Sequence, residues 1–134
     1  NPYETLASTT SWLSYAWNVF SKCPDRYVFT ERMIPLMQHY YRDAFEKLEQ
    51  HDPASYKIVR YEDLVADPEA TIRDIYAYFG IEMNPEFERI LVQESNAAKQ
   101  YVSTHEYDLA AMGFDQEEVY EEFKYVFERF GYEK

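Results

Sequence analysis

Cysteine and long apolar runs are scarce in this sequence of 134 residues. The single cysteine, Cys23, cannot form an internal disulfide, which fits a reducing compartment, and we expect a cytoplasmic protein. No run approaches the roughly 18 apolar residues of a membrane helix, and no signal-peptide pattern opens the chain. We therefore expect no membrane span.

Basic residues are also few, with 13 Lys and Arg against 25 Asp and Glu, for a formal net charge of −12. Such a surface repels nucleic acid and anionic membranes, so both are excluded as partners. There are no internal repeats and no Cys/His spacings typical of metal sites, so no metal is expected. Apolar residues make up 46% of the chain and aromatics 19%, which indicates one small globular domain with a hydrophobic core.

The central stretch, Tyr56–Gly80, organises our interpretation of the chain. Tyr56–Tyr61 contains adjacent β-branched residues between tyrosines and predicts a strand buried on both faces, as in a parallel sheet. The following turn, Glu62–Ala66, lies where α/β folds place their ligands, beyond the carboxyl end of a strand.

A helix is predicted directly after this turn. Asp67 is a good N-cap, Pro68 suits the first helical position, and Gly80 suits the stop. One apolar stripe follows at helical spacing: Ile72, Ile75, Tyr76 and Phe79. The stretch therefore predicts one strand–turn–helix unit of an α/β fold.

The rest of the chain predicts helices. We expect them over Asn1 to about Phe20, from about Met33 to Gln50 with Pro35 in the first turn, as a short helix after Asn84-Pro85, and from Asp115 to Gly131. The expected buried faces are Leu6, Leu13, Ala16, Trp17 and Phe20; Met33, Leu36, Met37, Tyr40, Ala44 and Leu48; Phe87, Ile90 and Leu91; and Val119, Phe123, Phe127 and Phe130. A long polar loop is expected over Gln93–Phe114.

One strand cannot satisfy its own backbone groups, so its neighbours must come from elsewhere. The chain also starts without Met, at a helix-capping Asn-Pro pair. We therefore expect residues 1–134 to be the C-terminal part of a larger α/β domain.

The segment Arg60-Tyr-Glu-Asp-Leu, followed by Asp67-Pro68 and a helix ending in Tyr-Phe-Gly, resembles the central block of the sulfotransferases. The resemblance implies a parallel-sheet, P-loop-like fold. It implies transfer of a sulfuryl group from 3′-phosphoadenosine-5′-phosphosulfate to a hydroxyl or amine of a small-molecule or carrier-bound acceptor. The family's 5′-phosphosulfate loop, catalytic lysine and general base would precede Asn1, so no catalytic residue is assigned.

Two donor contacts follow from the resemblance. Asn1–Ser8 is similar to the segment that grips the donor's 3′-phosphate, with Ser8 as the matching ligand, and the family's arginine would precede Asn1. Tyr61 matches a tyrosine that contacts the adenine ring. The alternatives are an ordinary helix serine and a core aromatic. Arg60, Glu62 and Asp63 are read as a structural network rather than a catalytic trio.

Two further cations lie where Ser-x-His-x-Tyr resembles the closing segment of bacterial-type sulfotransferases. Lys99 and His105 are candidate donor contacts, and the alternative is a loop-ordering or solvated role. His39 is read as a helix-surface or core histidine rather than a base.

Two other function classes stay open. The chain could be a non-catalytic helical interaction module, with no nucleotide affinity and its strand completed by a partner's sheet edge. A nucleotide kinase-like phosphotransferase would require a Gly-rich phosphate loop, and the three glycines form none.

Overall fold

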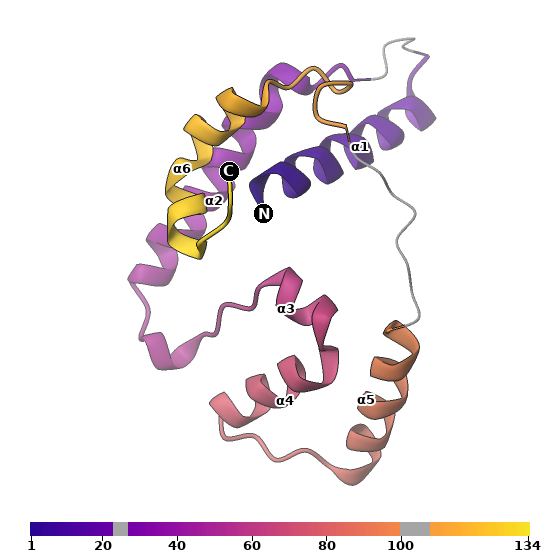
Figure 1. Ribbon diagram of the computed structural model, residues 1–134, viewed down its shortest axis with the longest axis vertical. Helices are drawn as coiled ribbons and strands as arrows, with labels where there is room; N and C mark the ends of the chain where they lie inside the picture. The colour runs from indigo at the N-terminus through magenta and orange to yellow at the C-terminus, as the bar shows by residue number, and fades with distance from the viewer. Residues whose placement is uncertain (23–26, 100–107) are drawn as a thin grey trace. The chain divides into compact units, whose positions relative to one another are not determined.

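The computed structural model describes residues 1–22, 27–99 and 108–134, and this part of the chain is mostly helical, with no strand (Figure 1). It contains α1 (Pro2–Phe20), α2 (Thr30–Glu49), a 3-10 helix η1 (Pro53–Ser55), α3 (Tyr61–Ala66), α4 (Pro68–Tyr78), α5 (Pro85–Ala98) and α6 (Gln116–Phe130). The chain forms two compact units, residues 1–46 with 105–134 and residues 47–104. Cys23, His105 and the Ser-x-His-x-Tyr segment lie outside the described residues.

The first unit is a core shared by α1, α2, α6 and the turn before α6 (Figure 1). Its buried apolar residues are Leu6, Ala7, Met33, Met37, Met112, Phe114, Val119, Phe123, Val126 and Phe127. Aromatic rings extend this core: Phe127 packs edge-on against Tyr3 with centroids 4.9 Å apart, and Phe123 lies 5.9 Å from Tyr41. The predicted stripe of α6 is thus confirmed for Val119, Phe123 and Phe127, while Phe130 is half-buried.

The predicted caps at Asn1 and Asp115 and the predicted stop at Gly131 are confirmed. The Asn1 side chain accepts a hydrogen bond from the Tyr3 amide at 3.0 Å, and Asp115 accepts one from the Glu118 amide at 2.9 Å. Gly131 ends α6 with φ of 65°, in the left-handed region that suits glycine. Each cap satisfies amides or carbonyls that the helix itself leaves unpaired.

The predicted buried faces of the first two helices are partly wrong. On α1, Trp17 is 41% and Phe20 88% exposed, because the helix buries its small and polar side with Leu6, Ala7, Thr10 and Ser14. The buried Thr10 hydroxyl has a hydrogen-bond partner within the helix, because it donates to the Leu6 carbonyl at 2.7 Å. Small residues permit close helix packing. A prediction based on the positions of large apolar side chains therefore misses this buried face.

The second helix begins at Thr30 rather than near Met33, so Pro35 lies inside it rather than in its first turn. The Thr30 hydroxyl donates to the Met112 carbonyl at 2.8 Å, which ties this helix start to the turn before α6. Leu36 and Tyr40 are 37% and 59% exposed, and Ala44 is exposed too. Met33 and Met37 are buried as predicted, and the helix also turns Ile34, Tyr41 and Phe45 toward the core, where aromatic contacts with α6 fix its rotation.

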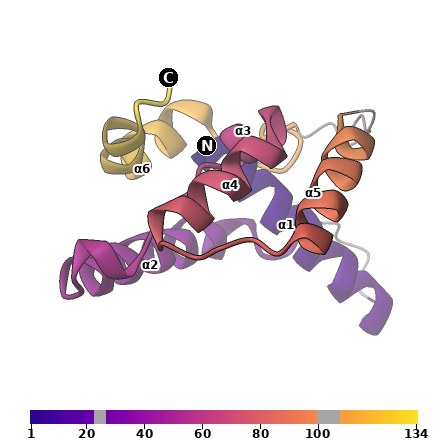
Figure 2. The ribbon, with the colours of Figure 1, turned by 90° about the horizontal axis from the view of Figure 1, so that it is seen from below.

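In the second unit, α3 packs on α4 and α4 packs on α5. Figure 2 shows α4 and α5 joined by an extended connection that begins at Gly80, whose φ is 63°. The expected stop at Gly80 and the caps at Asp67 and Asn84 are confirmed. Ile72, Ile75, Tyr76 and Phe87 are half-buried, but Phe79 and Ile90 are 40% and 41% exposed, and the buried residues of α5 are Leu91 and Ser95.

Three predictions about the second unit are wrong. Tyr56–Tyr61 is not a strand: residues 56–60 have no regular secondary structure, and Tyr61 is the first residue of α3. The expected turn Glu62–Ala66 is helical, since Glu-Asp-Leu-Val-Ala closes onto Arg60 through a bond from the Leu64 amide at 3.1 Å. The helix after Asn84 runs to Ala98, so Gln93–Ala98 belongs to α5 and not to a loop.

Within the described residues, no helix combines the length and apolar character needed to cross a membrane. Within the same residues, no cluster of His, Cys, Asp or Glu side chains is arranged to hold a metal ion.

Truncation of Phe123 tests the core of the first unit. Because this ring is 1% exposed, Phe123→Ala should lower the free energy of unfolding by about 3–5 kcal/mol. Urea unfolding of the full protein measures the change. Glu128→Ala, at an exposed position of the same helix, is the matched control and should change stability by less than about 0.5 kcal/mol. Equal effects of the two substitutions would contradict this core.

Candidate functional site

The motif Arg60–Pro68 forms the short helix α3 and its junction with α4. Arg60 is the residue before α3 and has extended backbone, with φ of −79° and ψ of 139°. Tyr61 follows as the first helical residue, and its side chain is 70% exposed. Tyr61 is therefore not a core aromatic in the described structure, and its ring presents a flat apolar face to a ligand.

Arg60 and Glu62 form an ion pair, in line with the predicted structural network, whereas Asp63 contributes its backbone carbonyl. Arg60 Nε lies 3.8 Å from Glu62 Oε2. The Asp63 carbonyl accepts the Asp67 amide at 3.0 Å, and the Asp67 carboxylate in turn accepts the Ala70 amide at 3.1 Å. These bonds close α3 and cap α4 at a single junction.

A polar side of α4, which the sequence interpretation missed, holds this region together. Thr71 Oγ1 donates to the Asp63 carbonyl at 3.1 Å, and the Tyr78 hydroxyl donates to the Pro53 carbonyl at 2.6 Å. Between them, Asp74 Oδ2 lies 2.6 Å from Lys57 Nζ. Thr71, Asp74 and Tyr78 fall at helical spacing, and that spacing is the signal that could have revealed them.

The opposite side of the junction is fixed to α5 by Arg73. Its guanidinium lies 2.9 Å from Glu69 and 3.1 Å from Glu88, so it joins α4 to the first turn of α5. Hydrogen bonds to Glu69 and then Glu88 raise the pKa of Arg73 further above its ordinary value. The Tyr76 ring stacks on Phe87 with centroids 5.3 Å apart, which adds an apolar contact to the charged one.

Ser8 lies on the exposed side of α1, two turns after the Asn1 cap. The Asn1 side chain already occupies the Tyr3 amide, and the Thr5 hydroxyl donates to the Asn1 carbonyl at 3.0 Å. An exposed serine hydroxyl can donate a hydrogen bond to a phosphate, although Ser8 lies beyond the first turn, in which the helix dipole favours a negative charge.

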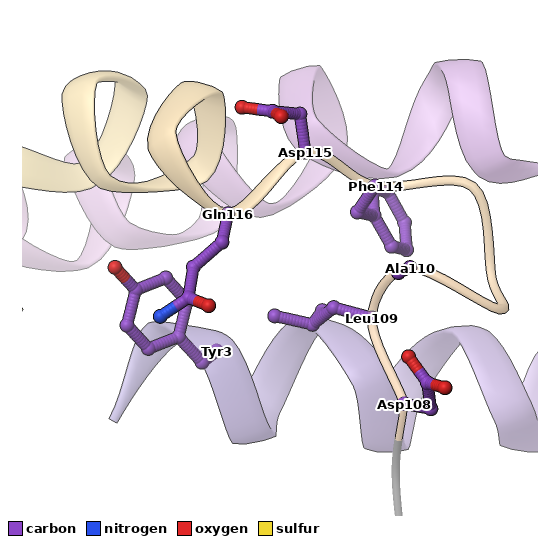
Figure 3. A pocket seen from close by; sticks show the side chains of 7 residues that line it. All are labelled: Tyr3, Asp108, Leu109, Ala110, Phe114, Asp115 and Gln116. Atoms are coloured by element: carbon purple, nitrogen blue, oxygen red, sulfur yellow. The ribbon is translucent and has the colours of Figure 1, made fainter.

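A surface hollow of about 560 Å³ lies beside this helix start (Figure 3). It is lined by Tyr3, Asp108, Leu109, Ala110, Phe114, Asp115 and Gln116. In the close-up, the Leu109 side chain points toward the Tyr3 ring. Two carboxylates among the lining residues oppose a phosphate here, so this hollow suits a neutral or cationic group better than the 3′-phosphate of a nucleotide.

The remaining predicted contacts lie elsewhere. Lys99 is exposed and forms the C-cap of α5, and His39 lies on the exposed surface of α2. Ser8 belongs to the first unit, whereas Tyr61 and Lys99 belong to the second. The structure therefore defines the surroundings of each of these residues within its own unit.

Comparison with protein families gives the class of protein. The model of the sulfotransferase family matches residues 1–85, which include both the Asn1–Ser8 and the Arg60–Pro68 segments. The chain therefore belongs to the sulfotransferase family. Comparisons with curated proteins and with solved structures returned no match.

Removal of the Asp67 carboxylate tests the α3–α4 junction. Asp67→Ala should lower the free energy of unfolding by about 1 kcal/mol, because the Ala70 amide loses its partner. Thermal unfolding of the full protein measures the loss. Asp67→Asn, whose side-chain oxygen can still accept, is the matched variant and should stay within a few tenths of a kcal/mol of the parent. Similar losses for Ala and Asn would show that Asp67 does not act as a cap.

Proposed function

We propose that this chain forms part of a sulfotransferase that transfers a sulfuryl group from 3′-phosphoadenosine-5′-phosphosulfate to an acceptor hydroxyl or amine. The observation that carries the proposal is the family match, because it spans both segments in which the donor contacts are expected. Ser8 would contact the 3′-phosphate, and Tyr61 would stack on the adenine ring. Lys99 and His105 are further candidate donor contacts.

The exposure of Ser8 and Tyr61 supports these roles. Ser8 lies two turns into α1, on its exposed side, where its hydroxyl can donate a hydrogen bond to an anion. Tyr61 exposes 70% of its side chain, at the end of an extended segment. The Ser8 hydroxyl thus suits the charged phosphate of the donor, and the Tyr61 ring suits its flat base.

The proposed role of these residues is to bind and orient the donor. Sulfuryl transfer, like phosphoryl transfer, depends mainly on positioning the groups in line and on stabilising charge on the transferred oxygens. Holding the nucleotide at both its 3′-phosphate and its base fixes the direction in which the sulfuryl group points. No residue of this chain is assigned to the proton transfer or to the leaving-group oxygen.

We also propose that these residues complete a parallel-sheet α/β domain. Tyr56 and Arg60 have extended backbone, and Ile58 between them is 43% exposed, as in a segment available for pairing. On α1, Trp12, Tyr15 and Phe20 are 67%, 72% and 88% exposed. Large apolar side chains in such a row suit a helix that packs on a sheet.

A calorimetric titration of the full-length protein with adenosine 3′,5′-bisphosphate, beside 5′-AMP, tests the proposal. Binding that depends on the 3′-phosphate would support a sulfotransferase donor site. Equal or absent binding of the two nucleotides by a folded protein would reject it. The alternative would then be a helical interaction module that uses the exposed apolar residues of α1.

The Ser8 hydroxyl is tested by Ser8→Ala in the same titration. A hydrogen bond to a charged group contributes about 1.5–3 kcal/mol, so the dissociation constant of adenosine 3′,5′-bisphosphate should rise by about tenfold or more. The affinity for 5′-AMP should not change. Ser11→Ala, which removes a hydroxyl one turn further along α1, is the matched control and should bind both nucleotides like the parent. Unchanged affinity of the Ser8 variant would remove this residue from the site.

A further inference from the structure

Three side chains of α4 each hold a different point of the chain between Pro53 and Asp63. Tyr78 holds the Pro53 carbonyl, Asp74 holds the Lys57 ammonium, and Thr71 holds the Asp63 carbonyl, at 2.6, 2.6 and 3.1 Å. We call Thr71, Asp74 and Tyr78 the polar face of α4. The order of the contacts is reversed along the two segments, so residues 53–63 run antiparallel to α4.

Lys57 makes the central contact with more than one group. Its Nζ lies 2.6 Å from Asp74 and 4.7 Å from the centroid of the Tyr78 ring. The Lys57 side chain is only 21% exposed, although that of Asp74 is 66% exposed. A carboxylate and an aromatic face both attract the lysine ammonium group, so these contacts hold the Lys57 side chain in one place.

The part of the segment that precedes Tyr61 is not held by a regular helix or strand of its own. Residues 56–60 have no regular secondary structure, and Ile58 is 43% exposed. Tyr61 lies between the second and third contact points, four residues after Lys57 and two before Asp63. The exposed Tyr61 ring therefore takes its position from α4 and not from packing around the ring itself.

We propose that the polar face of α4 is a positioning device for Tyr61, with Lys57 as its central positioning residue. The proposal rests on the proposed function, in which the Tyr61 ring stacks on the donor's adenine. Holding residues 53–63 at three points lowers the conformational freedom that the segment must lose when the nucleotide binds. The face thereby raises donor affinity without touching the donor.

The test measures the affinity of full-length variants for adenosine 3′,5′-bisphosphate by calorimetry. Lys57→Met keeps the aliphatic stem but removes the charge, and Asp74→Asn removes the partner charge at an exposed position. Both should raise the dissociation constant by about three- to tenfold, since an ion pair and a cation–π contact are each modest. Lys57→Arg, which keeps the charge and the aromatic contact, should restore most of the affinity.

A double-mutant cycle with Tyr61→Ala distinguishes an effect of Lys57 on the position of Tyr61 from an effect on the stability of the whole unit. If the polar face acts through Tyr61, Lys57→Met should have almost no further effect on affinity in a Tyr61→Ala protein. If the affinity losses caused by Lys57→Met and Tyr61→Ala simply add in the double variant, the proposal is overturned. Arg89→Met is the control, because it breaks another ion pair of the same unit, Arg89–Glu86 at 2.7 Å, which does not contact residues 53–63. It should bind the nucleotide like the parent.

The outcomes distinguish this inference from the function on which it rests. A parent protein that does not bind adenosine 3′,5′-bisphosphate rejects the proposed function, and the positioning role with it. A parent that binds, with Lys57→Met and Asp74→Asn binding equally well, rejects the positioning role alone. Reduced affinity in Lys57→Met with no rescue by Lys57→Arg also counts against it.

Discussion

The hydrogen bond from the Tyr78 hydroxyl to the Pro53 carbonyl, at 2.6 Å, begins the series of contacts on which the second unit depends. Residues 56–60 have no regular secondary structure. Their position must therefore come from a neighbour, because ordering an extended segment costs about 1–2 kcal/mol of entropy per residue. Helix α4 supplies that neighbour, and it is fixed in turn by its Asp67 cap and by Arg73 on Glu69 and Glu88.

Features that depend on nearby residues could be predicted from the sequence. Asn1, Asp67, Asn84 and Asp115 all cap helices as their local patterns indicate, and Gly80 and Gly131 have the positive φ that a helix stop needs. A cap requires only a side-chain oxygen and an amide two or three residues away. No knowledge of the rest of the fold is needed to recognise it.

Features that depend on residues far apart in the chain could not be predicted from the sequence. The rotation of α2 is set by Tyr41 and Phe45 against rings of α6, so Leu36 and Tyr40 face outward despite their apolar character. The β-branched pair Ile58-Val59 indicates a strand, but a strand exists only when another pairs with it. For the site, the motif located Tyr61. The spacing of Thr71 and Tyr78 marks a polar side of α4, but it does not indicate their partners, which are the backbone carbonyls of Asp63 and Pro53.

Charge sets the last constraint on how this chain could hold a nucleotide. The net charge is −12, and the cations around the motif already face carboxylates: Lys57 faces Asp74, Arg60 faces Glu62, and Arg73 faces Glu69 and Glu88. The first two are neutral pairs, and Arg73 with its two carboxylates carries a net negative charge, so none of the three groups attracts a distant polyanion strongly. Affinity from these residues must then come from short-range groups, such as the Ser8 hydroxyl on α1 and the Tyr61 ring. Such contacts depend on the placement of each group far more than a long-range field does, so in the proposed function the three side chains of α4 that hold residues 53–63 would act on donor binding through placement alone.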